Sequence, residues 1–132
     1  MRQPLNSVWR RRCARELDVK WPESQLTAIQ HPPQLTPGQT LRVELAVKGR
    51  ADESRKFSAR LVDPAGTVKV QTDVSLRPLT RIDLDLPDDA TSGAYKLVVV
   101  LYDPVTLAPF ADSAGDSVIE LSEVELLDVP AP

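Results

Sequence analysis

The amino-acid sequence predicts an all-β fold, a single antiparallel β-sandwich of about seven strands. From Ser24 onward, short segments in which apolar and polar residues alternate recur roughly every 8 to 14 residues. Proline, glycine and aspartate residues of the kind that form turns separate these segments. Because no helix-sized segment lies between the strands, the pattern argues against a parallel sheet with crossover helices.

The clearest strand is predicted for residues 40–48, TLRVELAVK. Apolar side chains at its odd positions alternate with mainly polar side chains at its even positions. This alternation is typical of a strand with one buried face and one solvated face. The sequence TPG at residues 36–38 supplies the turn that precedes the strand.

Residues 56–72 are predicted to form a β-hairpin. Its central turn is DPAG, residues 63–66, with Asp first, Pro second and Gly fourth, as in a type I turn. Apolar and polar residues alternate before this turn and again after it, at Val68 and Val70. The two halves are therefore predicted to be strands that pair with each other.

Two further strands are predicted at residues 80–86 and 95–102. The first alternates and ends at Pro87, because proline cannot donate to a strand ladder. The second is apolar at both parities. That pattern indicates a central strand covered on both faces, or one whose outer face contacts another part of the molecule.

The last predicted strand covers residues 118–129 and follows a long connection over residues 103–117. The apolar residues in its first half and in its second half have opposite parity. A bulge near residues 122–123, or a strand that crosses between sheets, would reconcile the two halves.

Residues 1–22 are predicted to be a short basic N-terminal lead-in that is irregular or helical. Residues 23–129 are predicted to form the sandwich, which is of immunoglobulin-like type. A short helix over residues 7–16, with Ser7 as its N-cap, is one form the lead-in can take. Residues 1–20 hold six basic and two acidic side chains, whereas the other 112 residues carry a net charge of −7. Because this acidic body would repel a phosphate backbone, no nucleic-acid partner is predicted.

No transmembrane segment is predicted, because the longest apolar run, residues 97–102, is too short to cross a bilayer. The first twenty residues also lack the apolar stretch of a secretory signal peptide. Contact with an anionic membrane surface is possible through a basic cluster, and the alternative is a solvated tail. The cluster consists of Arg10, Arg11, Arg12 and Arg15.

No catalytic, metal or cofactor site is predicted. The one histidine, His31, precedes two prolines in a polar connection and is interpreted as a surface loop residue, and no nucleophile elbow is present. The one cysteine, Cys13, lies among arginines that would lower the pKa of its thiol, and the alternative is an exposed thiol without a role. One cysteine and one histidine do not supply the four ligands of a structural zinc site.

Acidic residues are another possible kind of site, since paired carboxylates serve glycosidases and bind calcium. The two pairs here are interpreted instead as a solvated strand face and a turn, namely Asp83 with Asp85 and Asp88 with Asp89. The loop DSAGDS, residues 112–117, has oxygen ligands for a weak calcium site, but its spacing alone is not a calcium motif.

Three aromatic residues are the candidate ligand contacts, Trp21, Tyr102 and Phe110. Aromatic ring faces stack on sugar rings in carbohydrate-binding modules, although three scattered rings are few for a platform. Gly93 and Tyr95 are instead predicted to form a structural corner, in which the tyrosine hydroxyl bonds back to the upstream backbone.

Two stretches carry a family resemblance, KFSARLVDPAGTVKVQTD (56–73) and LPDDATSGAYKLVVVLYDPVTLAPFADSAGDSVIELSEVEL (86–126). The residues that match its pattern are Asp63, Gly66, Asp73, Leu86, Pro87, Gly93, Tyr95, Leu97, Leu101, Tyr102, Asp103, Pro104, Thr106, Gly115, Asp116, Val118, Leu121, Val124 and Glu125. With them the chain resembles the C-terminal extracytoplasmic β-sandwich domain of bacterial multi-spanning membrane glycosyltransferases. TPGQTLRVELAV (36–47) together with LPDDATSGAYKLVV (86–99) also resembles the macroglobulin-type immunoglobulin-like domains.

Both resemblances imply an immunoglobulin-like fold, and the first implies an extracytoplasmic location. Neither implies transferase activity, because the transmembrane helices and catalytic acidic residues of those enzymes are not in this sequence. We therefore expect a non-catalytic module for protein–protein interaction or a structural accessory, with exposed edge strands as docking sites. The alternative is a carbohydrate-binding accessory linked to cell-envelope glycan, and a third hypothesis is a small hydrolase that uses acidic residues.

Overall fold

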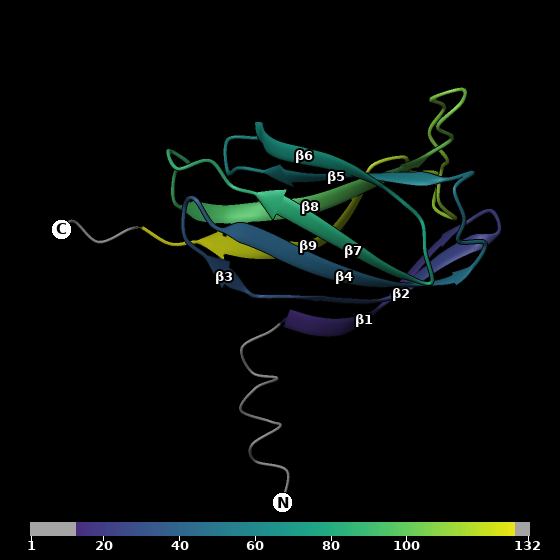
Figure 1. The fold of residues 1–132 in the computed structure, drawn as a ribbon, viewed down its shortest axis with the longest axis horizontal. Helices are drawn as coiled ribbons and strands as arrows, with labels where there is room; N and C mark the ends of the chain where they lie inside the picture. Colours follow the sequence, from purple (N-terminus) through teal and green to yellow (C-terminus); the bar gives the residue numbers. More distant parts are fainter. Residues whose placement is uncertain (1–12, 129–132) are drawn as a thin grey trace, which may run out of the picture.

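In the computed structural model, which describes residues 13–128, these residues form nine β-strands in two stacked sheets and no helix (Figure 1). Sheet A contains, in spatial order, β1 (Cys13–Trp21), β2 (Ser24–His31), β4 (Thr40–Gly49) and β7 (Leu79–Asp85). Sheet B contains, in spatial order, β3 (Gln34–Leu35), β9 (Ile119–Leu126), β8 (Gly93–Tyr102), β5 (Lys56–Val62) and β6 (Val68–Ser75). All neighbours are antiparallel except β3 and β9. The predicted all-β sandwich is confirmed.

The core lies between the two sheets and is built from the alternating apolar positions. In β4, Leu41, Val43 and Leu45 are fully buried while the intervening side chains face solvent or are half-buried. Phe57 and Leu61 of β5 are equally buried on the opposite sheet. Burying side chains of this size contributes about 1.5–3 kcal/mol each, so the period-two pattern is what holds the layers together.

The predicted hairpin at residues 56–72 is confirmed as β5 and β6, which pair in antiparallel register. Its turn closes where the Gly66 amide donates to the Asp63 carbonyl at 2.9 Å. The Asp63 side chain also accepts hydrogen bonds from the amides of Ala65 and Thr67, at 3.0 and 2.8 Å. Gly66 has φ +90°, a conformation that glycine adopts without steric cost.

The apolar run that was predicted to be a central strand is β8, which lies between β5 and β9. Its outward-facing Val98 and Val100 are each only 9% exposed, so both faces of the strand are covered. Next to it, β9 contains the predicted bulge. Leu97 pairs with Ser122 but Val98 pairs with Glu120, so the irregularity falls at Leu121, one residue before the expected position.

The expectation of an irregular or helical lead-in over residues 1–22 is corrected by β1. Residues 13–21 form an edge strand that pairs with β2 from Cys13 opposite His31 to Trp21 opposite Ser24. Leu17 and Val19 pack against the core, which explains why this segment is extended. The proposed helix over residues 7–16 is therefore wrong for residues 13–16, and its earlier part lies outside the described residues. The alternation Leu17, Val19, Trp21 was the signal that would have predicted the strand.

His31 is the second correction, because it is a core residue and not a surface loop residue. It ends β2 and is fully buried between the sheets. The pairing of β2 with β4 is irregular between Leu26 and Ala28, which changes the parity so that Ile29 and His31 face inward. The alternation in the sequence does not reveal this change of parity, because a bulge interrupts the period of two from which buried positions are predicted.

Tyr95, predicted to form a structural corner with Gly93, makes a hydrogen bond to the backbone upstream of it. The Tyr95 hydroxyl donates to the Thr91 carbonyl at 2.7 Å, and the Tyr95 ring is buried in the core. Gly93 has φ +139°, and a Cβ atom there would lie 2.7 Å from Cγ of Pro64. The glycine therefore allows the end of β8 to approach the β5–β6 turn closely.

Candidate functional site

The three aromatic candidate residues lie at or near one end of the sandwich, where the connection over residues 103–117 begins and folds back. The Phe110 amide donates to the Leu101 carbonyl at 2.8 Å, and Tyr102 forms a β-bridge with Pro109. The Ser113 amide donates to the Lys20 carbonyl at 2.8 Å, which ties the connection to β1 beside Trp21. Whether the rings form a platform then depends on their exposure.

Trp21 is a core residue with only 5% of its surface exposed. Its ring packs against Phe57, with centroids 5.6 Å apart and planes tilted by 57°. Among the described residues its indole Nε1 has no hydrogen-bond partner. A ring buried in this way is not available to stack on a sugar.

Phe110 is half-buried, and its ring face is covered by the guanidinium of Arg55, which lies 4.5 Å from the ring centroid. Arg55 is itself 4% exposed and donates to the Pro22 carbonyl and to Ser24 Oγ, the latter at 3.0 Å. It also pairs with Glu23 at 3.3 Å. Arg55 therefore connects the β1–β2 turn to the 103–117 connection. The Phe110 ring packs against Arg55 as part of this contact and does not face a ligand.

Tyr102 is half-buried at the end of β8, on the outer face of sheet B. Its hydroxyl donates to Oδ2 of Asp73 at 2.7 Å. Partial burial, this hydrogen bond and the negative charge of Asp73 raise the pKa of Tyr102 to about 12. The three rings thus have three different environments and form no common exposed platform, so the carbohydrate alternative stays a prediction from sequence.

The basic cluster is described only in part. Arg10, Arg11 and Arg12 lie outside the described residues. Arg15 lies in β1 and is exposed. The predicted contact with an anionic membrane surface therefore remains a prediction. No helix in the described part of the chain is long and apolar enough to cross a bilayer.

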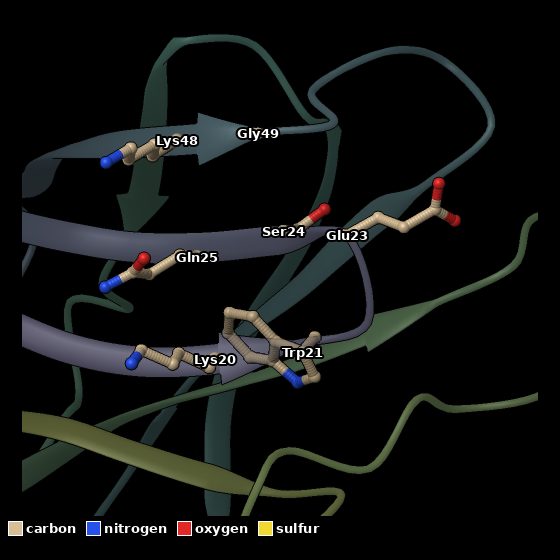
Figure 2. Close-up of a pocket in the computed structure, with 7 residues that line it drawn as sticks. All are labelled: Lys20, Trp21, Glu23, Ser24, Gln25, Lys48 and Gly49. Carbon is tan, nitrogen blue, oxygen red and sulfur yellow. The ribbon is translucent and has the colours of Figure 1, made fainter.

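Figure 2 shows a shallow hollow of about 280 Å³ at the β1–β2 turn. The side chains of Lys20, Gln25 and Lys48 extend from three neighbouring strands in the same direction, and Glu23 extends the opposite way. The carboxylate of Asp18 lies 3.8 Å from the Lys20 ammonium and accepts a hydrogen bond from Gln25 at 3.0 Å. Because this carboxylate already offsets the local positive charge, the two lysines do not make the hollow an anion site.

His31 and Ser122 have the geometry of a base and a nucleophile, with Nε2 and Oγ 2.5 Å apart. His31 Nδ1 lies 2.7 Å from the Pro32 carbonyl, which only accepts, so Nδ1 carries the proton and Nε2 accepts from the serine hydroxyl. Burial lowers the pKa of His31 and keeps it neutral. Both side chains are buried between the sheets, so the pair links β2 to β9 and is out of reach of a substrate.

The carboxylate candidates are also engaged or solvated. Asp83 pairs with Arg42 at 3.1 Å, and Asp85 accepts from the Thr40 hydroxyl at 2.6 Å. The Asp112 carboxylate accepts from the amides of Ala114 and Asp116, at 3.0 and 2.8 Å, as in a loop closed by its own aspartate. Among the described residues no three metal-ligating side chains of the His, Cys, Asp and Glu types come together.

The outer face of sheet B contains a hollow of about 330 Å³ next to β6. Arg60, Gln71 and Asp73 give it polar groups. Val100, Leu107 and Pro109 give it apolar groups. Leu107 is 70% exposed and has φ +63°, an uncommon conformation for a leucine, and its amide donates to the Asp103 carbonyl at 2.7 Å. The connection therefore holds an apolar side chain in solvent at the border of this hollow.

The four edge strands of the two sheets differ in how far they are protected against pairing. In β3 only two residues pair, and β1 contains a bulge between Glu16 and Val19. In β7 the exposed side chains Arg81 and Asp83 already pair with Glu44 and Arg42. β6 runs for eight residues, and from Val70 to Ser75 its pairing with β5 is regular. It contains no proline and, in the described structure, has no strand on its other side (Figure 1).

The direction of the main-chain groups in β6 follows from its last hydrogen bond to β5. The Leu76 amide donates to the Arg55 carbonyl at 3.1 Å. In an antiparallel ladder, alternate residues point their amide and carbonyl groups to opposite sides. From Val70 to Ser75, the even-numbered residues therefore face β5, and the amides and carbonyls of Gln71 and Asp73 face the open edge. Sequence reasoning expected exposed edge strands but could not identify this one, because the order of strands in a sheet is a tertiary property.

No model of a known protein family matches the chain, and no curated protein matches it.

Proposed function

We propose that this chain is a non-catalytic, immunoglobulin-like β-sandwich that binds a protein partner by strand addition at the open edge of β6. The observation that carries the proposal is the row of outward-facing main-chain groups at Gln71 and Asp73 on a regular, uncovered strand. Such edges are usually bulged, shortened or covered, because they pair readily with other chains. An extended segment that adds to an edge gains its affinity from main-chain hydrogen bonds.

The strand order supports the immunoglobulin-like assignment. In sheet B the order β9-β8-β5 corresponds to strands G, F and C, and β6 occupies the place of a C′ strand next to C. In sheet A the order β2-β4-β7 corresponds to A, B and E. The hydroxyl bond of Tyr95 supports the assignment of β8 as strand F, where such a tyrosine corner occurs.

The surroundings of β6 also favour a protein partner. The hollow on the outer face of sheet B borders Gln71 and Asp73, so side chains of an added strand that lean across β6 would reach it. Leu107, exposed at the same border, offers an apolar contact. Specific pairing needs such side-chain pockets in addition to main-chain bonds, because the main chain is the same in every partner.

The resemblance to glycosyltransferase-associated sandwiches fits this role as an accessory module. It suggests an extracytoplasmic, bacterial setting and a partner in the assembly of cell-envelope glycans. These suggestions extend the proposal beyond strand addition. They add no catalytic residue to the chain.

The test compares two proline variants of the full chain in capture experiments from the native lysate. Gln71→Pro removes an outward-facing amide of β6. Arg81→Pro is the matched control, because the amide of Arg81 faces outward on the β7 edge. Its direction follows from the hydrogen bond that the Val47 amide donates to the Pro78 carbonyl, since alternate residues of a strand face opposite sides. We expect the wild type and Arg81→Pro to capture the same protein and Gln71→Pro to retain less than about a tenth of it. Equal capture by Gln71→Pro would overturn the proposal. Retention on a glycan array by the wild type and by Gln71→Pro would favour the carbohydrate alternative.

A further inference from the structure

We infer that β6 pairs with β6 of a second copy of this chain. The two strands run antiparallel and are related by a two-fold axis at Gln71. This inference rests on the proposed strand addition and names its partner. The result would be a symmetric dimer in which the five strands of sheet B continue into those of the second copy. The charges and the main-chain directions of β6 select this register.

Main-chain geometry limits the possible registers. Residues that face each other in an antiparallel pair must both point their amide and carbonyl groups toward the partner, or both away. In the regular part of β6, odd residues therefore pair with odd residues, and the two-fold axis passes through one residue position. The central positions are Gln71, Thr72 and Asp73. Lys69 lies at the irregularity of the β5–β6 pairing, between Val68 and Val70, so the rule does not extend to its main chain and only its side chain is used in the comparison of registers.

The register centred on Gln71 is the one that matches charges. It places Lys69 opposite Asp73 of the second copy, and the symmetry makes this ion pair twice. It also places Val70 opposite Thr72, so two β-branched side chains meet on the inner face. Opposite charges and β-branched pairs that face each other across strands are both stabilising.

The two competing registers lack this match. Centring on Thr72 places Gln71 opposite Asp73 and Lys69 opposite Ser75, so no ion pair forms across the edge. Centring on Asp73 places the two Asp73 carboxylates opposite each other. Like charges in direct opposition destabilise a strand pair.

The charged groups of β6 are accessible for this contact. The Asp73 carboxylate uses Oδ2 for the Tyr102 hydroxyl at 2.7 Å, while Oδ1 has only a long contact of 3.5 Å with Gln71. Lys69 is exposed, and its ammonium lies 3.8 Å from the Asp63 carboxylate. A carboxylate oxygen and an ammonium proton therefore remain for the second copy.

The edge of β7 also has alternating charges, but it fits a second copy less well. A two-fold axis at Ile82 would pair Arg81 with Asp83, yet Arg81 and Asp83 already form ion pairs within sheet A. The same register sets the exposed Leu79 opposite the carboxylate of Asp85. Arg81→Pro therefore serves as the control for Gln71→Pro, and it also tests whether two copies pair through β7.

The experiment measures self-association of the full chain by sedimentation velocity over a wide concentration range. We expect the wild type to form a dimer and Lys69→Asp and Asp73→Lys each to dissociate at least about tenfold more readily, because two attractive pairs become repulsive. An equimolar mixture of the two variants should form a heterodimer, since a carboxylate then faces an ammonium at both symmetry-related pairs. Arg81→Pro should dimerise like the wild type, whereas Gln71→Pro should not.

Three outcomes would overturn the inference. They are a monomeric wild type at all concentrations, a mixture of charge variants that does not associate, and a Gln71→Pro dimer as strong as that of the wild type. If the wild type is monomeric while Gln71→Pro still loses a captured protein, the dimer is wrong and the proposed function stands. If the dimer forms as expected but Gln71→Pro captures every other protein normally, the inference stands, and the proposed capture of a different protein at β6 is overturned.

Discussion

The strands β1 and β6 lie at opposite sides of the molecule in Figure 1, and both are edge strands, but they are built differently. β1 has a bulge after Glu16 and carries four charged side chains that face solvent, Arg15, Glu16, Asp18 and Lys20. Bulges and charges on an edge discourage pairing with other chains. β6 is regular from Val70 to Ser75 and exposes its main-chain groups. The comparison indicates that the β1 edge is protected against pairing, and we call it the closed edge. The β6 edge, the open edge, is available for a partner.

The two edges are also attached to the core differently. β1 ends in the fully packed Trp21, and the β1–β2 turn is held by the buried Arg55. β6 contributes only the half-buried Val70 and Val74 to the core. We therefore expect the closed edge to carry more of the stability and the open edge to carry the binding.

Trp21→Ala is expected to have the largest effect on stability. It leaves a large cavity at the end of β1, which lowers the free energy of unfolding by about 3–5 kcal/mol. Val70→Ala, the matched truncation on β6, should cost about 1 kcal/mol, because its side chain is half-buried. Urea denaturation followed by circular dichroism measures both. Equal costs at the two sites would contradict the difference between the edges.

Tyr95→Phe removes the hydroxyl bond to the Thr91 carbonyl, away from both edges. We expect the free energy of unfolding to fall by about 1–2 kcal/mol, since the Thr91 carbonyl loses its partner. Binding at β6 should be unchanged in the same preparation. A variant that is as stable as the wild type but has lost binding would show that the corner has a functional role.

The His31–Ser122 link is expected to make the stability of the fold depend on pH. Burial lowers the pKa of His31 in the folded state below its ordinary value of 6.5, so the unfolded chain binds more protons below that pH. The free energy of unfolding should therefore fall as the pH drops below 6.5. Denaturation midpoints at a series of pH values test this, with His31→Gln as the variant that should lose the part of the dependence that begins at 6.5. A wild-type midpoint that stays constant through the acidic range would contradict the buried neutral histidine.

Tyr102 offers a smaller, local test of β6, because the Asp73 carboxylate accepts a hydrogen bond from its hydroxyl. Its pKa of about 12 lies above the ordinary value of 10.0, so folding should weaken as the pH rises between these values. Ultraviolet absorbance reports the ionisation of the phenol. Asp73→Asn should lower the pKa of Tyr102 by removing the charge, and burial should keep it above 10.0. A Tyr102 pKa that is unchanged by Asp73→Asn would contradict the contact between the two side chains.

The smallest expected effect on stability is that of Gln71→Pro. The Gln71 amide faces the open edge and makes no bond to β5, so its loss should cost about 1 kcal/mol or less. Thr72→Pro is the matched contrast, because the Thr72 amide faces β5, and its loss should cost about 1–3 kcal/mol since an acceptor on β5 is left without a partner. Urea denaturation of the two variants distinguishes them. Equal destabilisation would show that the main-chain directions inferred for β6 are wrong.

Much of the fold could be predicted from local patterns. β4, the β5–β6 hairpin and the corner at Tyr95 follow from alternation and turn chemistry within a few residues. His31 could not be recognised as a core residue, because the bulge after Leu26 shifts the parity on which such predictions depend. In β1 the alternation of Leu17, Val19 and Trp21 is visible in the sequence, so that strand could have been predicted. The position of β6 at the edge of sheet B is a property of the assembled sheet. The local sequence around Gln71 and Asp73 therefore does not predict it.

The most direct test is hydrogen exchange at the amides of Gln71 and Asp73, followed by NMR at increasing protein concentration. In the monomer these amides should exchange rapidly while the Thr72 amide, which faces β5, is protected. As β6 pairs with a second strand, Gln71 and Asp73 should become protected, and Arg81 and Asp83 on β7 should not. Association that leaves Gln71 and Asp73 in rapid exchange would contradict strand addition at β6.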